Sequence, residues 1–107
     1  MDDRVVGGIG IEPRADIYQY SAEIGFWLSP PHWGRGVMTA AVEAVSVWAF
    51  AETDLVRLEA PVLAWNPASM RVLEKCGYTR EGVVTDAAYK DGQWVDSVLY
   101  ARLQEPA

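Results

Sequence analysis

One stretch constrains the fold of this chain more than any other: a loop bearing prolines and glycines, residues 29–39, between two apolar segments. Residues 24–28 are typical of a buried strand, while residues 38–51 contain strong helix formers and no glycine or proline, which predicts a helix. The first N–H groups of a helix have no partner within it and lie at the positive end of its dipole. The loop can therefore bind phosphate, although an ordinary strand-to-helix turn would explain Gly34 and Gly36 equally well.

The strands predicted around this loop indicate a mixed sheet. Residues 5–11 and 17–28 predict a β-hairpin. The second of these strands carries apolar side chains on both faces, so we expect it to be central and covered on both sides. Residues 55–65 predict a further strand, in which Pro61 indicates an edge position, a bulge, or a place where the strand parts from its neighbour.

Local signals define the second half of the chain. Asn66 is a favourable N-cap, Pro67 follows at the first helical position, and Gly77 fits a left-handed C-terminal cap. Two extended runs, 78–89 and 93–103, are then joined through Asp-Gly, the strongest short hairpin signal. The predicted order is β-β-α-β-α-β-β, a mixed α/β fold with no internal repeat or linker.

The long helix predicted over 38–51 is apolar on nearly every side. Only Glu43 and Ser46 interrupt its apolar surface, so we expect the helix to be buried against the sheet. The stripe that should face the sheet, at helical spacing, consists of Met38, Ala41, Val42, Val45, Trp48 and Ala49.

Length and composition restrict the functional classes. The 107 residues suffice for one small domain, placed over residues 1–107. The net charge of −6 argues against nucleic-acid binding and mildly favours cationic partners such as amines, unless the charge serves solubility. With one cysteine, Cys76, and one histidine, His32, neither a disulfide framework nor a metal site is expected. We expect a reducing, cytoplasmic setting, with no signal peptide or membrane span.

Several groups of residues, in this order along the chain, resemble the GNAT superfamily of acyl-CoA-dependent N-acetyltransferases. Some are similar to its RimJ/RimL branch, which acetylates α-amino groups of ribosomal proteins and includes acetylators of polyamines and small-molecule amines. The groups are the strand 23–28, the loop Trp33-Gly34-Arg35-Gly36 with Thr39, the segment 66–78, the pair Glu81-Gly82, and the pattern Asp91-Gly92, Asp96, Tyr100. The resemblance implies a GNAT-like mixed central sheet that lacks the first strand and helices of the family.

The resemblance also implies catalytic roles. It places a general base at Glu23, which on a covered strand should have a raised pKa; a structural role or an ion pair with an arginine is the alternative reading. A backbone N–H near Trp27 or Leu28 would stabilise the oxyanion. Leu73 stands where many members carry a tyrosine acid and cannot donate a proton, so the resemblance points to Ser69 as the acid, with capping of the helix's first turn as the alternative.

Acetyl-CoA is the cosubstrate that the resemblance implies. Its pyrophosphate would bind backbone N–H groups of the loop, with help from the Thr39 hydroxyl and Arg35, and its pantetheine arm would bind Asn66. Tryptophan at 33 is normal in this branch, whereas Met38 matches the loop pattern more loosely. The implied cofactor-binding residues are Phe26, Trp27, Leu28, Trp33, Gly34, Arg35, Gly36, Val37, Met38, Thr39 and Asn66.

Three functions remain open at this level. The first is an active N-acetyltransferase that transfers the acetyl group directly to an amine. The second is a truncated domain that binds acyl-CoA with little turnover, or that works only when paired with a second chain. The third is an interaction module without a ligand. Because the family's leading strand and helices are missing, we expect a homodimer or strand-exchanged pair through residues 5–11 or the hairpin 89–103.

Overall fold

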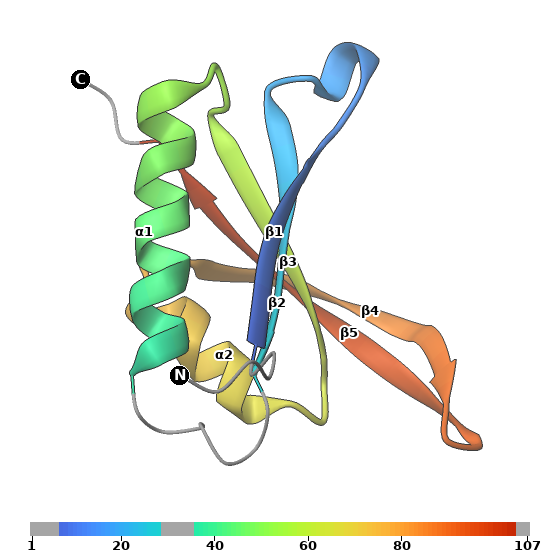
Figure 1. The fold of residues 1–107 in the computed structure, drawn as a ribbon. Coiled ribbons are helices and arrows are strands. Elements are labelled where there is room, and N and C mark those ends of the chain that lie inside the picture. The colour runs from blue at the N-terminus through green and yellow to red at the C-terminus, as the bar shows by residue number, and fades with distance from the viewer. Residues whose placement is uncertain (1–6, 29–35, 105–107) are drawn as a thin grey trace.

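The computed structural model describes residues 7–28 and 36–104, and residues 1–6, 29–35 and 105–107 lie outside this description. The described elements follow the order β-β-α-β-α-β-β, as predicted, with a short 3₁₀ turn at Asp16–Tyr18 between the first two strands. The strands are β1 (Gly7–Pro13), β2 (Ser21–Leu28), β3 (Arg57–Leu63), β4 (Thr79–Lys90) and β5 (Gln93–Leu103). The helices are α1 (Val37–Glu52) and α2 (Pro67–Lys75). The strands form one five-stranded sheet in the order β1-β2-β3-β5-β4 (Figure 1).

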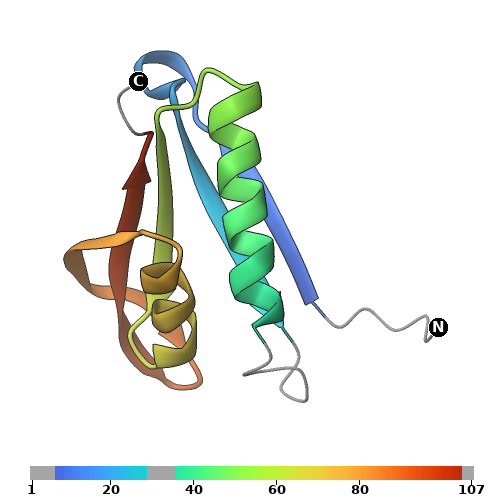
Figure 2. The ribbon, with the colours of Figure 1, turned by 90° about the vertical axis from the view of Figure 1, so that its left-hand side faces the viewer.

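The sheet divides between β2 and β3. These strands are parallel and pair only from Ser21–Arg57 to Glu23–Glu59, whereas β2 stays paired with β1 as far as Leu28. Beyond that point the two strands diverge, as Figures 1 and 2 both show. Pro61, which has no N–H to donate, lies two residues after Glu59 in β3. Of the three readings offered for Pro61, the parting of neighbouring strands is therefore the one the structure supports.

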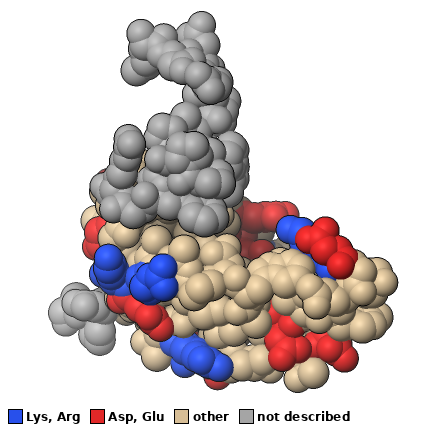
Figure 3. Space-filling model, turned by 90° about the horizontal axis from the view of Figure 1, so that it is seen from below, with Lys and Arg blue, Asp and Glu red and all other residues tan. Residues whose placement is uncertain are grey.

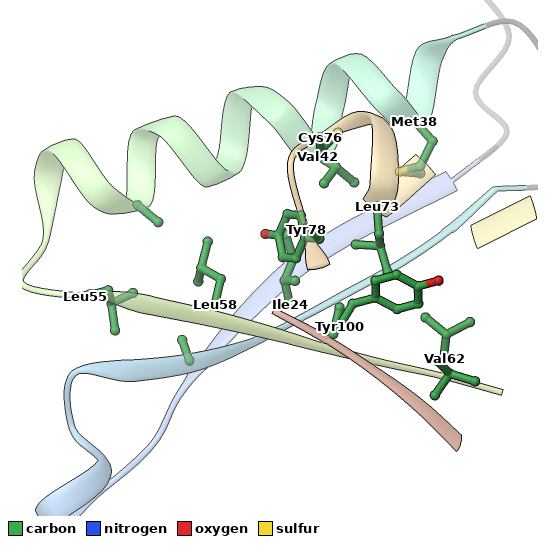
Figure 4. Close-up of a cluster of buried hydrophobic side chains, with 14 residues drawn as sticks. Ile24, Met38, Val42, Leu55, Leu58, Val62, Leu73, Cys76, Tyr78 and Tyr100 are labelled. Atoms are coloured by element: carbon green, nitrogen blue, oxygen red, sulfur yellow. The ribbon is translucent and has the colours of Figure 1, made fainter. Parts of the chain in front are cut away.

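Both helices pack on the same face of the sheet. The strands contribute Ile24, Leu58 and Tyr100 to the core, and the helices contribute Val42 and Leu73, each of them at most 1% exposed. Figure 4 shows these side chains meeting between α1, α2 and the sheet. Full burial of such a side chain stabilises the fold by about 1.5–3 kcal/mol, so this layer fixes how the helices sit on the strands.

The opposite face of β2 is open to solvent among the described residues. Ala22 and Ile24 are buried on the helix side, while Glu23 and Gly25 on the other side are exposed. The expectation that β2 is covered on both faces is therefore wrong for this chain. The reason is that both described helices cover one face only.

The buried stripe of α1 also differs from the prediction. Trp48 is 57% exposed, although it was expected to face the sheet. Ser46 is fully buried instead, and its hydroxyl forms a 2.7 Å hydrogen bond with that of Tyr78. Because α1 is apolar on almost all sides, periodicity alone does not indicate which side of the helix is buried. A buried serine is tolerated at position 46 because its hydroxyl has a hydrogen-bond partner.

The local signals are confirmed. Gly77 has a φ of +80°, and the bonds from Gly77 N–H to Glu74 C=O and from Tyr78 N–H to Leu73 C=O form the Schellman motif that ends α2. Asp91 and Gly92 both have positive φ, as a two-residue type I′ hairpin turn requires.

The apolar side chains of the β4–β5 hairpin are only partly buried. Val98 and Tyr100 are buried, whereas Val83, Val84 and Trp94 are exposed. Trp94 lies in the part of the hairpin that extends beyond β3, because β3 pairs with β5 only as far as Ser97, while Val83 and Val84 lie on the outer strand β4.

Candidate functional site

The ends of two strands and two helices lie together at one end of the molecule. The carboxyl ends of β2 and β3 and the amino ends of α1 and α2 all lie there, as both ribbon views show (Figures 1 and 2). Figure 3 looks at this end from below, where uncharged surface fills the middle of the described part and charged side chains lie around it. The strands that diverge and the helices that begin here make this end the candidate site.

The amino end of α1 has no side-chain cap from its N-cap residue. Gly36 is the N-cap, with a left-handed φ of 72°, and it has no side chain that could accept a bond from the N–H groups of this first turn. The turn also holds no acidic residue. The Gly36 carbonyl accepts the first helical bond from Ala40 N–H, at 3.0 Å. The N–H groups of Val37, Met38 and Thr39 have no acceptor within the helix and lie at the positive end of its dipole, where an anion is favoured.

Gly36 leaves space in front of these donors. A Cβ added there would meet nothing within 4 Å among the described residues. A bound group could therefore approach the backbone closely, and a side chain at this position would obstruct it.

The amino end of α2 is capped. Asn66 Oδ1 accepts a 3.2 Å hydrogen bond from Ser69 N–H, and Pro67 needs no partner because it has no N–H. The predicted cap is thus confirmed, and it uses the backbone of Ser69 rather than its hydroxyl. Whether that hydroxyl acts as an acid remains a prediction, and Leu73, fully buried in the core, is no substitute.

The parting of the sheet frees backbone groups along β2. After the Glu23–Glu59 pair, the side of β2 that faces β3 lies outside the ladder, and alternate residues from 24 to 28 direct N–H and C=O groups to that side. Phe26 is half-buried in this segment. For Trp27 and Leu28 the structure describes the backbone only, and their proposed part in oxyanion binding remains a prediction.

The open face of the sheet carries ion pairs instead of a covered base. The Glu23 carboxylate is 48% exposed and lies 3.8 Å from Arg14, so the ion pair that was the alternative reading is present. Glu23 is therefore not the covered carboxylate that was expected on this strand. Arg14 also bonds Glu59 at 2.7 Å.

A second arginine extends this network. Arg57 bonds Glu59 at 2.8 Å and Glu81 at 2.9 Å. Both hydrogen bonds raise the pKa of Arg57, and the bond with Glu81 has the larger effect. The bond with Arg57 in turn lowers the pKa of Glu81. Glu81 is exposed, so solvent screens much of this interaction.

One residue with a structural role, Arg102, carried no sequence signal, and a second, Tyr100, belongs to the pattern quoted for the family resemblance. Arg102 bonds Glu43 and the Cys76 carbonyl, both at 2.9 Å, and so joins α1 to the end of α2. Tyr100, buried at 1% exposure, donates to Glu74 in α2 at 2.9 Å. A strand-to-helix contact between residues far apart in the chain follows from topology, which residue types alone do not specify.

Cys76 is a buried residue at the end of α2. Burial, followed by the nearby Glu43 carboxylate, raises the pKa of its thiol, which disfavours the nucleophilic thiolate.

Part of the predicted site is not described. Trp33, Gly34 and Arg35 lie outside the described residues. Within 7–28 and 36–104 no group of three or more metal-ligating side chains is placed to hold a metal ion. In the same residues, no helix has both the length and the apolar character needed to cross a membrane.

Comparisons with known proteins agree with this arrangement. The chain is 39% identical over 102 residues to the probable N-acetyltransferase YjcK of Bacillus subtilis (strain 168), covering 95% of this chain and 56% of that protein. It is 29% identical over 102 residues to the ribosomal-protein-serine acetyltransferase of Escherichia coli (strain K12), with the same two coverages, 95% and 56%. The structure of RimL, a ribosomal L7/L12 α-N-protein acetyltransferase in complex with coenzyme A, superposes with a TM-score of 0.81 at 29% identity, covering 92% of this chain and 55% of that chain.

The chain thus spans about half the length of the curated relatives it matches. The model of the acetyltransferase (GNAT) domain family matches residues 1–79, which is more than half of the chain. The divergence of β2 and β3 and the open end of α1 fall within this matched region. The chain therefore belongs to the GNAT acetyltransferase family.

Proposed function

We propose that this chain binds acetyl-CoA and transfers its acetyl group to a primary amine by direct attack. The observation that carries the proposal is the uncapped amino end of α1 beside the point where β2 and β3 diverge. An anion is the natural partner of such a helix end. The coenzyme A in the RimL complex supplies the precedent within the family.

The binding roles follow from this placement. The pyrophosphate would bind the N–H groups from Gly36 to Thr39 and the Thr39 hydroxyl, with Trp33, Gly34 and Arg35 completing the loop. The pantetheine arm would lie along β2 between the diverging strands, within reach of the Asn66 amide. Asn66 is exposed, and its cap uses only the side-chain oxygen, so its N–H₂ group remains available.

The chemistry needs three groups. Glu23, directly or through water, would take a proton from the attacking ammonium, which frees the nitrogen lone pair. The new N–C bond then forms while a backbone N–H near Trp27 or Leu28 stabilises the oxyanion. The C–S bond breaks, and Ser69 would return a proton to the departing thiolate.

The acceptor class is a primary amine: a protein N-terminal α-amine, a polyamine or a small-molecule amine. The E. coli relative, named for ribosomal-protein serine acetylation, favours the first. The net charge of −6 suits any cationic acceptor. A cytoplasmic setting, supported by the single cysteine, is part of the proposal.

We also propose that the chain forms a homodimer. β1 and β4 are the outer strands of the described sheet, and each presents unpaired backbone groups along one side. The exposed Tyr89 and Trp94 pack edge to face, 5.2 Å apart, and give the hairpin 89–103 an apolar end. Residues 7–11 of the other candidate interface lie on β1. Sedimentation at low micromolar concentration should show a dimer, and a stable monomer would contradict it.

The direct test measures binding and turnover separately. Calorimetry should show CoA binding, and acetyl-CoA with a panel of amines should release free CoA in the steady state. Binding without turnover would favour the truncated acyl-CoA-binding domain. Absence of binding would overturn the proposal in favour of an interaction module.

The base is tested by a matched pair of variants. Glu12 lies directly opposite Glu23 in the β1–β2 ladder and shares its exposed face. Glu23→Gln should lower turnover about 100-fold or more at neutral pH while CoA affinity is retained. Glu12→Gln should leave turnover close to that of the parent. Equal turnover in the two variants would remove Glu23 from the mechanism.

A further inference from the structure

We propose that Arg102 is a positioning residue for acetyl-CoA binding, because it fixes the end of α2 against the first turns of α1. The inference rests on the proposed function, since it concerns the helix end assigned there to the pyrophosphate. Arg102 itself lies near the carboxyl end of β5 and would not touch the cofactor.

Arg102 joins three elements through one nitrogen. Its Nη1 donates to Glu43 Oε2 in α1 and to the Cys76 carbonyl at the end of α2, both at 2.9 Å. The carbonyl at a helix end lacks a helical partner, and a cation there is favourable. The guanidinium carbon also lies 5.9 Å from the centre of the Phe50 ring, on the same helix as Glu43.

A second contact connects the end of α2 to the proposed cofactor site. The Cys76 thiol donates to the carbonyl of Thr39, 3.2 Å away, in the first turn of α1. Thr39 is one of the residues assigned to the pyrophosphate. Cys76 thus receives a bond from Arg102 on its carbonyl and makes one to the binding turn with its side chain, so two contacts connect β5 to the binding turn.

The burial of these groups makes the connection stiff. Cys76 is 2% exposed, and the side chain of Arg102 is 22% exposed. A cavity of about 570 Å³ lies beside them, lined in part by Lys75, Gly77 and Thr79. Because this space is open, removal of the guanidinium would take away the contact that joins the end of α2 to β5 and α1 without new packing to fill its place.

Two substitutions at Arg102 separate its charge from its apolar stem. Arg102→Met keeps a stem that can pack on Phe50 but removes both hydrogen bonds, and we expect CoA to bind about five- to tenfold more weakly. Arg102→Lys keeps a donor nitrogen on a shorter side chain and should recover part of the loss. Glu43→Gln should weaken CoA binding less than Arg102→Met, because the Cys76 contact remains.

The control removes a comparable arginine elsewhere. Arg57 is 24% exposed and also bonds two groups, but on the open face of the sheet. Arg57→Gln should lower stability without changing CoA affinity. Thermal unfolding of every variant confirms that the affinity is measured on folded protein.

The decisive readout compares CoA with pantetheine, which lacks the pyrophosphate. If Arg102 positions the phosphate-binding turn, Arg102→Met weakens CoA binding and leaves pantetheine binding unchanged. An equal loss for both ligands, or no loss for either, would overturn the inference. If the parent chain binds CoA no more tightly than pantetheine, the proposed function fails first, so the two failures are distinguishable.

Discussion

The two helices begin at the same end of the molecule, but only one of them has an N-cap residue whose side chain bonds its first turn. In α2 the Asn66 side chain bonds the first turn, whereas in α1 Gly36 provides no side chain at all. The helices differ along their length as well: α2 is short and amphipathic, and α1 is long and apolar almost all round. A short helix needs its caps to be stable, while a long one that packs well can leave its first N–H groups to a ligand.

The largest effect should come from the core contact of α2. Leu73 is fully buried, and Leu73→Ala should lower the free energy of unfolding by about 3 kcal/mol. Trp48, on the outer face of α1, is 57% exposed, and Trp48→Ala should change stability by about 0.5 kcal/mol or less. Denaturant titration measures both. A large loss in Trp48→Ala would mean that the outer face of α1 is covered in solution.

The next effect concerns the uncapped helix end. Gly36→Val places a branched side chain at a φ of +72° and in the path of the phosphates, so CoA should bind at least about tenfold more weakly. Gly92→Val creates similar strain at φ +78° in the hairpin turn, again with open space around the Cβ. Calorimetry should find normal affinity in the Gly92 variant. If the Gly36 variant also binds normally, the phosphate site is elsewhere.

A smaller effect should come from the capped helix end. Asn66→Ala removes the acceptor for Ser69 N–H and should cost about 1 kcal/mol of stability. Asn66→Asp keeps the acceptor but loses the amide donor assigned to pantetheine. The aspartate variant should therefore be as stable as the parent and bind CoA several-fold more weakly. If Asn66→Asp binds CoA as tightly as the parent, Asn66 acts only as the N-cap of α2 and does not bind pantetheine.

The sequence predicts those parts of the fold that depend on neighbouring residues. Asn66, Pro67 and Gly77 set the ends of α2, and Asp91-Gly92 sets the hairpin, because each acts through its own backbone conformation. The divergence of β2 and β3 was one of three interpretations of Pro61. The sequence could not choose among them, because the missing N–H removes one ladder hydrogen bond at an edge, at a bulge and at a point of divergence alike.

Other features depend on which surfaces come together. The exposure of Trp48 and the burial of Ser46 were not predictable from a helix that is apolar on every side. Glu23 was expected on a covered strand, but both described helices lie on the other face of the sheet. The contacts of Arg102 join residues 26 and 59 positions apart, and no local pattern indicates them.

The most direct test of the account follows backbone amide resonances by NMR as CoA is added. If the open end of α1 binds the pyrophosphate, the amides of Val37, Met38 and Thr39 should shift most among the helical residues, and to lower field as they donate hydrogen bonds to phosphate. The amide of Ser69, already bonded to Asn66, should move much less. Saturating CoA that leaves residues 37–39 unchanged, or that shifts the first turn of α2 instead, would contradict the account.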